Sequence, residues 1–152
     1  MRNTKIESIE NVLVCVDESK EFVSALKYSC QAAMIGNLGL IMLYVIEDEN
    51  FRHWKGVESI MEVEQNDMAK EILKKYKFLI KKEYSIKTKT LIKKGNKLDV
   101  LIEIANSKKY KIKNLILGLA LDDSNSNRII TSLTGSARKK LTLPITIVPA
   151  NI

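Results

Sequence analysis

Three residues in the second half of the chain have the size and chemistry to hold a phosphate. Gly118 lies near the end of an apolar run at 115–119, and Gly135 and Ser136 close a stretch of small hydroxylated residues that begins at Thr131. Glycine lets a backbone N–H group approach a phosphate closely, and a serine hydroxyl can donate a hydrogen bond to it. We expect this stretch to open a helix, whose dipole would favour an anion at that end. In the alternative interpretation, Gly118 relieves a strand end and Gly135 only begins the helix.

Asp17 is the acidic candidate in the first half of the chain. It ends the apolar run Asn11–Asp17, a pattern typical of a parallel strand that is buried on both faces. Its carboxylate could contact a ligand at the end of that strand or cap the turn that follows, and the two roles are compatible. Ser19 is the predicted N-cap of the next helix, which ends near Gly36.

The motifs of a dedicated catalyst are missing from the sequence. None of the patterns G-x-S-x-G, G-x-x-x-x-G-K-[ST] and G-x-G-x-x-G occurs. The single histidine, His53, precedes Trp54 in a charged segment at 47–56, where it could cover a bound base or face solvent. One histidine and two distant cysteines, Cys15 and Cys30, lack the usual zinc spacing, and reduced thiols are expected. We therefore predict no catalytic residue, no metal ligand, and a protein that acts by binding.

The elements that would position these residues alternate along the chain. Apolar or alternating runs predict five strands, at 11–17, 40–45, 84–92, 115–119 and 145–148. Apolar residues at helical spacing predict helices between Ser19 and Gly36, at 57–82, at 98–109, and from Thr131 to a stop at Pro144. This alternation predicts an α/β fold, in which an open parallel sheet carries helices on both faces.

Lysine dominates the charge of the chain. The 152 residues carry a formal net charge of +7, with lysine-rich runs at 74–82, 87–94 and 108–113. No arginine cluster or aromatic-basic repeat accompanies them, so a solvated surface is favoured over a nucleic-acid site, which would need the lysines on one face. The longest apolar run, Leu38–Ile46, is far shorter than the roughly 20 residues that span a bilayer. The polar start of the chain lacks the apolar stretch of a signal peptide, which predicts a cytoplasmic protein.

The stretch at 114–149 resembles the C-terminal part of the universal stress protein family. That part contains a strand, the pattern G-x2-G-x9-G-[ST], a helix, and a strand that follows a proline. Gly118 matches the first glycine, Gly135 and Ser136 match the closing pair, and 144–148 matches the final strand with its proline.

Two departures from the family pattern bear on ligand binding. Leu121 stands where the family has its second glycine, and Gly118 and Gly135 are four residues further apart than the pattern allows. Leucine cannot let a phosphate rest on the backbone as glycine does, and Asp122 and Asp123 would repel a phosphate unless Mg²⁺ intervened. We expect weak or absent binding of ATP, with Mg²⁺ only as its companion.

The resemblance implies a Rossmann-like sheet of the adenine nucleotide alpha hydrolase-like type, with strand order 3-2-1-4-5. In that order Asp17 lies next to Gly118, where the chain reverses direction and open α/β sheets hold their ligands. The family further implies that Asp17 and Val45 contact the adenine of ATP, with its phosphates at Gly135 and Ser136.

We expect the chain to form one domain, 1–152, with a core at about 11–149 that the resemblance covers. The resemblance implies a cytoplasmic stress-response binding protein. The alternatives are a slow ATPase or nucleotide-dependent switch, and a basic nucleic-acid-binding module. The last strand, at 145–148, is apolar and uncharged, and a strand of this kind at a sheet edge needs a cover. We expect two chains to pair through this strand as a homodimer, which the resemblance also implies.

Overall fold

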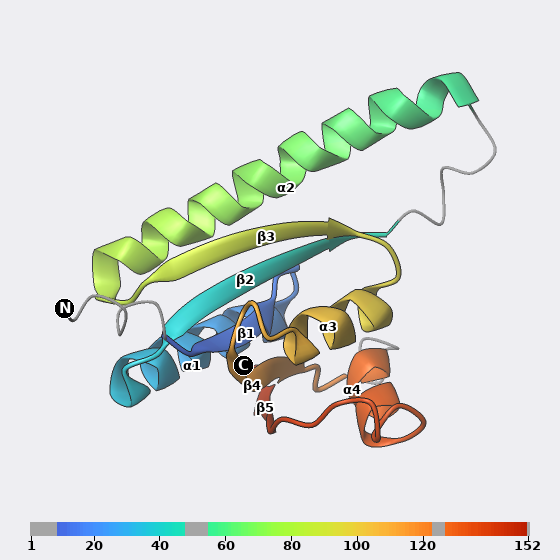
Figure 1. Cartoon of the computed structure of the whole chain (residues 1–152). Helices are drawn as coiled ribbons and strands as arrows, with labels where there is room; N and C mark the ends of the chain where they lie inside the picture. The colour runs from blue at the N-terminus through green and yellow to red at the C-terminus, as the bar shows by residue number, and fades with distance from the viewer. Residues whose placement is uncertain (1–8, 48–54, 123–126, 152) are drawn as a thin grey trace.

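A computed structural model describes residues 9–47, 55–122 and 127–151, and it contains a five-stranded sheet in which all neighbouring strands are parallel. The strand order is β3-β2-β1-β4-β5 (Figure 1). In chain order the elements are β1 (Asn11–Cys15), α1 (Lys20–Gly36), β2 (Gly39–Ile46), α2 (Lys55–Glu83), β3 (Thr88–Lys94), α3 (Lys97–Asn106), β4 (Ile112–Leu119), α4 (Arg128–Thr134) and β5 (Ile145–Pro149). The predicted α/β class and the strand order are therefore confirmed.

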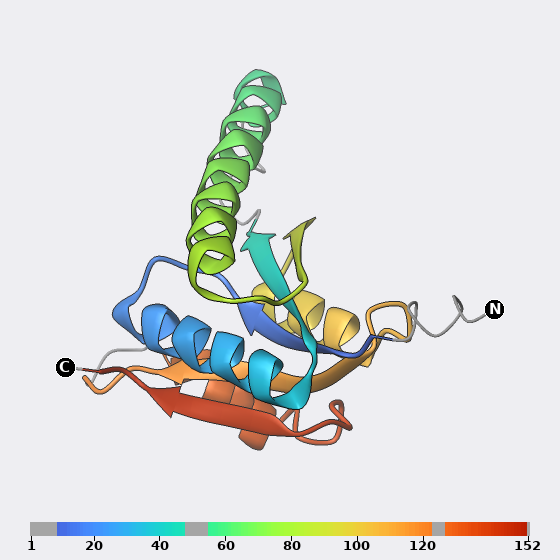
Figure 2. The same cartoon turned by 90° about the vertical axis from the view of Figure 1, so that its left-hand side faces the viewer.

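Helices cover both faces of the sheet (Figure 2). Side chains of α1 and α2 pack in one core cluster, and side chains of α3 and α4 pack in a second cluster on the opposite face. Because side chains alternate along a strand, Val12 and Leu13 of β1 point into different clusters. The central strands β1 and β4 are buried on both sides, as their uninterrupted apolar runs predicted.

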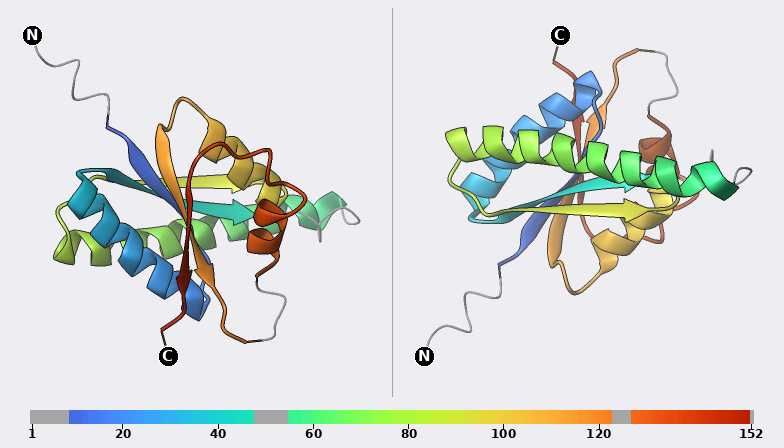
Figure 3. Two further views of the ribbon diagram at one scale, coloured as in Figure 1. Left: turned by 90° about the horizontal axis from the view of Figure 1, so that it is seen from below. Right: turned by 90° about the horizontal axis from the view of Figure 1, so that it is seen from above.

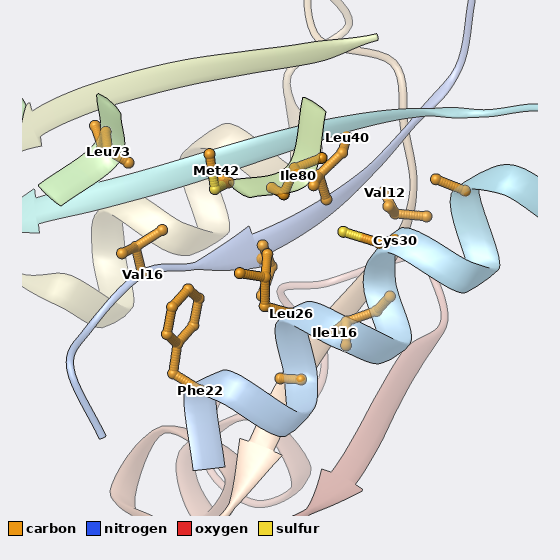
Figure 4. Packing of buried hydrophobic residues seen from close by; sticks show 13 residues of the cluster. Val12, Val16, Phe22, Leu26, Cys30, Leu40, Met42, Leu73, Ile80 and Ile116 are labelled. Atoms are coloured by element: carbon orange, nitrogen blue, oxygen red, sulfur yellow. The ribbon is translucent and has the colours of Figure 1, made fainter. Parts of the chain in front are cut away.

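Phe22 joins α1 to α2 within the first cluster. Its buried ring meets the ring of Tyr76 edge to face, with the two centroids 5.1 Å apart. Figure 4 shows side chains of α1 turned toward those of the strands and of α2. The labelled members of this cluster are Val12, Val16, Phe22, Leu26, Cys30, Leu40, Met42, Leu73, Ile80 and Ile116.

Helix α2 packs alongside β2 and β3 and continues past their C-terminal ends (Figure 3). Ala69, Leu73 and Ile80 are buried against the body of the protein, whereas the apolar side chains of Val63 and Met68 are exposed. No helix in the described part of the chain is both long enough and apolar enough to cross a membrane.

Several strand boundaries differ from the prediction by up to four residues, and β4 begins at Ile112 rather than at 115. β1 stops at Cys15, so that Asp17 lies beyond the regular strand. β3 begins at Thr88 rather than at residue 84, where the N–H group of Tyr84 donates to the carbonyl of Ile80, 2.8 Å away, and continues the hydrogen bonding of α2. These differences change neither the number nor the order of the elements.

Candidate functional site

The carboxyl ends of β1 and β4 meet where the order of the strands reverses. From β1 the chain adds β2 and β3 on one side, and it then returns to add β4 and β5 on the other. Val14 of β1 is paired with Ile116 of β4, so Asp17 and Gly118 lie at the same edge of the sheet. Open α/β sheets bind ligands at this switch point, because loops from both sides surround a crevice there.

Asp17 is bonded within the protein. One carboxylate oxygen, Oδ1, accepts hydrogen bonds from the hydroxyl of Ser19 and from its N–H group, the latter at 2.9 Å. The hydroxyl of Ser19 in turn accepts from the N–H group of Phe22 at 3.1 Å, which confirms Ser19 as the N-cap of α1. The capping role proposed for Asp17 is therefore observed.

Lys97, which the sequence analysis missed, lies beside Asp17. Its Nζ atom is 3.6 Å from Oδ2 of Asp17, and only 28% of its side chain is exposed. Burial alone would lower the pKa of the Lys97 amine, but neighbouring acidic groups outweigh burial and raise that pKa. Those groups are the thiol of Cys15 and the carboxyl groups of Asp17 and Glu47. Lys97 is therefore a fixed positive charge in the crevice.

The signal that could have identified Lys97 is its place in the chain. It is the first residue of α3, two residues after Gly95, which closes the turn that follows β3. Residues that start a helix directly after a parallel strand lie at the ligand-binding edge of the sheet. The lysine-rich run at 87–94 just before Lys97 concealed this position, because the lysines of that run lie on or next to an exposed edge strand.

Val45 and Cys15 lie on the face of the sheet that carries α3. Both are half-buried and pack against the core cluster of α3 and α4. Burial raises the pKa of the Cys15 thiol to about 11. Cys15 and Cys30 are both free thiols, as predicted. Val45, Asp17 and Gly118 thus share the carboxyl edge of the sheet, on three neighbouring strands or just beyond them.

Packing inside the protein, without any ligand, explains why residue 118 is a glycine. A Cβ atom built on Gly118 would lie 2.5 Å from the carbonyl oxygen of Glu21 and 2.9 Å from the Cβ atom of Glu21. Distances this short require the backbone of α1 to move. The lack of a side chain at Gly118 therefore lets the first turn of α1 pack directly on β4.

Asn127 closes the loop that follows β4. Its side-chain oxygen accepts from the N–H group of Ala120 at 2.9 Å, and its side-chain nitrogen donates to the carbonyl of Ala120 at 3.0 Å. The N–H group of Ala120 is consequently used within the protein. Leu121, which replaces a glycine of the family pattern, has 53% of its surface exposed. His53, Trp54, Asp123 and the rest of 123–126 lie outside the described residues.

Both predicted ends of the last helix are wrong, because it neither begins at Thr131 nor continues to a stop at Pro144. Helix α4 covers Arg128–Thr134, and Gly135 lies at its C-terminal boundary rather than in its first turn. The hydroxyl of Thr131 donates to the carbonyl of Asn127, and that of Thr134 donates to the carbonyl of Ile130, as hydroxyls inside a helix do. The hydroxylated stretch therefore forms the helix itself and does not cap it.

Gly135 and Ser136 belong to the turn that ends α4. The N–H group of Gly135 donates to the carbonyl of Ser132 at 3.3 Å, and the guanidinium of Arg138 donates to the carbonyl of Gly135 at 2.9 Å. A Cβ atom at Gly135 would lie 2.8 Å from the carbonyl oxygen of Thr131, so this turn also needs a glycine. The free N–H groups expected at Gly135 occur only in the first turn of a helix, and Gly135 lies after the last turn of α4.

Comparison with known proteins identifies the fold. No protein-family model matches the chain, and no curated protein matches it. A universal stress protein UspA from Lactobacillus plantarum superposes with a TM-score of 0.73 at 20% sequence identity, over 91% of this chain and 97% of that one. A protein of the universal stress protein family from Burkholderia pseudomallei gives a TM-score of 0.72 at 15% identity, over 93% of this chain and 96% of that one.

A third similar structure contains a ligand. It is a universal stress protein in complex with cAMP, with a TM-score of 0.65 at 17% identity, over 94% of this chain and 98% of that one. The structural neighbours are universal stress proteins and cover more than 90% of the chain. The chain therefore has the fold of the universal stress proteins.

Proposed function

We propose that the chain is a universal stress protein of the cytoplasm that acts by binding an adenine nucleotide weakly, without turning it over. The nucleotide would lie across the carboxyl ends of β1, β2 and β4, with its base near Asp17 and Val45. The observation that carries this proposal is the reversal of strand order between β1 and β4, with Asp17 and Gly118 at one edge. The similar fold of a protein that was crystallised with cAMP supports it.

Weak binding follows from the groups that the protein already uses. Asp17 accepts two hydrogen bonds from Ser19 and lies 3.6 Å from Lys97, so a base would compete with bonds inside the protein. Phosphates near Gly118, Gly135 and Ser136 would meet N–H groups that are partly engaged, as at Gly135. Each lost internal bond subtracts about 1 kcal/mol from the affinity. We therefore expect binding of ATP or AMP in the range of about 0.1 to 1 mM.

Pairing of two chains through β5 is the second part of the proposal. β5 is an edge strand, and Ile147, which is 39% exposed, places an apolar side chain there. No charged residue occurs at 145–149. An uncharged apolar edge attracts a second strand, and the same strand of another chain satisfies both edges when the two pair antiparallel. The protein would then be a homodimer.

Calorimetry combined with a hydrolysis assay tests the nucleotide proposal. Titration with AMP, cAMP and ATP with Mg²⁺ is expected to show one weak site per chain, and incubation with ATP is expected to release no phosphate above the buffer rate. An Asp17→Ala variant should bind less, whereas an Asp99→Ala variant, which removes an exposed carboxylate at the start of α3, should bind as the parent does. No heat with any nucleotide at about 5 mM contradicts binding. Steady phosphate release that Asp17→Ala abolishes would instead support an ATPase.

A further inference from the structure

We propose that a second ligand site, for a compact anion built from linked phosphates, lies at the N-terminal end of the sheet. A pocket of about 170 Å³ opens there, at the opposite end of the strands from Asp17. Four lysines line it: Lys87 just before β3, Lys89 near the start of β3, and Lys109 and Lys111 in the loop between α3 and β4. These lysines, with Asn11 and Tyr110, define what we call the basic pocket.

The parallel register explains why two distant segments of the chain meet there. Lys89 is paired with Ile41 of β2, and Leu91 is paired with Leu43. Ile41, Leu43 and Leu91 all belong to the core cluster under α3. Because side chains alternate along a strand, Lys89 projects on that same face, where the chain emerges from α3. The fold thus brings lysines that are about twenty residues apart in the sequence to one pocket.

Asn11 holds the loop that carries two of the lysines. Its backbone N–H group donates to the carbonyl of Lys111 at 2.9 Å, and its side chain donates to the carbonyl of Tyr110 at 2.7 Å. Lys111 has a φ of 48°, in the left-handed region that side chains with a Cβ atom seldom adopt. Asn37, which has a similar φ, caps the end of α1, a place where this conformation is usual. Lys111 instead ends the turn at 108–111 and directs the chain into β4, so its backbone conformation fixes the loop that carries Lys109.

Ordinary surface roles account for each pair of lysines but not for their convergence. Lysines on β3 protect a sheet edge, and lysines that follow α3 complement its dipole. Neither role requires the two pairs to line one pocket, where their charges repel. Among the residues that line this pocket in the described part of the chain, none is acidic. Glu10 precedes the pocket residue Asn11 in the sequence, but its carboxylate oxygen Oε1 lies 3.8 Å from Nζ of Lys113, which does not line the pocket.

The charge and size of the basic pocket favour linked phosphates. Even without the charge of Lys111, the ammonium groups of Lys87, Lys89 and Lys109 exceed the roughly two negative charges of one phosphate and favour linked phosphates. Lysine binds phosphate as a point charge and needs no fixed orientation. A single-stranded nucleic acid needs a track of cations and aromatic faces for its bases. Here the cations converge, and the Nζ atom of Lys109 already lies 5.4 Å from the centre of the Tyr110 ring. A compact oligophosphate therefore fits the basic pocket better than a single-stranded nucleic acid does.

Tripolyphosphate is the probe that tests this site. Calorimetry should show one site per chain, and inorganic phosphate should bind at least about tenfold more weakly. Amide signals in an NMR titration should shift at Lys89 and at 109–111. The double variant Lys89→Gln and Lys109→Gln should weaken binding by about tenfold or more. The matched double variant Lys74→Gln and Lys77→Gln removes the same charge from exposed positions of α2 and should change binding by less than about twofold.

Four results would overturn the proposal. No binding at about 1 mM tripolyphosphate excludes the site. An equal loss in both double variants shows attraction to net charge alone. Amide shifts at 17–19 instead of 109–111 place the anion at the nucleotide crevice, and leave the proposed function intact. A nucleic-acid surface is shown if a twelve-nucleotide oligothymidine binds more tightly than tripolyphosphate and if the double variant Lys89→Gln and Lys109→Gln abolishes that binding. All the substituted lysines are exposed, so thermal melts of the variants should coincide with that of the parent.

Discussion

The amine of Lys97 lies 3.6 Å from the carboxylate of Asp17, which makes an ion pair in the crevice where the strand order reverses. Asp17 lies two residues beyond β1, and Lys97 begins α3 eighty residues later in the chain. A ligand that uses the Asp17 carboxylate must first separate it from this amine. The pair therefore opposes binding at the position where the family resemblance implies a contact with adenine.

Removal of the Lys97 charge should strengthen the binding of a neutral base. In a Lys97→Met variant, the Asp17 carboxylate loses a partner, and the affinity for adenosine should rise by a factor of about two to five, as expected for a partly exposed ion pair. A Lys93→Met variant is the matched control, because Lys93 is exposed near the same edge of the sheet. Calorimetry with adenosine measures both. A lower affinity in Lys97→Met would show instead that Lys97 itself holds the ligand.

Gly118 should prove essential for stability rather than for a ligand alone. A Gly118→Ala variant forces a methyl group to within 2.5 Å of the Glu21 carbonyl oxygen, and the cost is expected to be about 2 to 4 kcal/mol. Urea denaturation followed by circular dichroism measures this loss. The control is Gly36→Ala, where the new atom meets only the flexible side chain of Leu38, at 3.2 Å. Equal midpoints for the parent and Gly118→Ala would refute the packing argument.

The fold was largely predictable because its signals are local and repeated. Uninterrupted apolar runs mark β1, β2 and β4 as buried parallel strands, and alternation marks the exposed edge strand β3. The strand order came from the family resemblance, since periodicity does not encode which strands are neighbours. The strand order implied by the resemblance placed Asp17 and Gly118 at the same carboxyl edge of the sheet, as observed.

The site was less predictable, because its residues are defined by contacts across the chain. The glycine at 118 predicts a close approach to a phosphate, but the close neighbour in the structure is the backbone of Glu21. The hydroxylated residues before Gly135 predict a helix start, yet Thr131 and Thr134 bond to carbonyls inside the helix. Lys97 had no distinguishing neighbour in the sequence. Only the fold brings it to Asp17.

Alkaline pH should destabilise the protein through Cys30. Burial raises the pKa of this thiol from 9.0 to about 11 in the folded protein, so the unfolded chain releases its proton first. The contribution to stability is complete below pH 9 and is lost as the pH rises through about 11, by up to about 3 kcal/mol. The urea midpoint of the parent should fall more between pH 8 and 11 than that of Cys30→Ala, which lacks the titrating group. Parallel pH profiles would contradict this assignment.

Ile147→Pro should separate the proposed dimer and leave the sheet intact. The carbonyl of Pro144 accepts from Leu115, and the N–H group of Ala150 donates to Leu119, so even-numbered residues of β5 bond to β4. The N–H group of Ile147 therefore points to the outer edge, and proline at this position removes an outward donor. Light scattering at about 50 µM should give twice 17.3 kDa for the parent and 17.3 kDa for the variant.

Thr146→Pro and Ile147→Val are the controls for this edge. Proline at 146 removes a donor that faces β4, so that variant should lose stability as well as pairing. Valine at 147 keeps the outward N–H group and should remain dimeric. A parent protein of 17.3 kDa at this concentration contradicts the pairing through β5.

The proposed binding of an adenine nucleotide at the carboxyl edge of the sheet is best examined by an NMR titration of the full chain with AMP. We expect fast-exchange shifts of the backbone amides at 17–19, 45–47 and 118–120, with half-saturation at about 0.1 to 1 mM, and no shift at 109–111. Shifts confined to another face of the protein, or none at about 5 mM AMP, would contradict it.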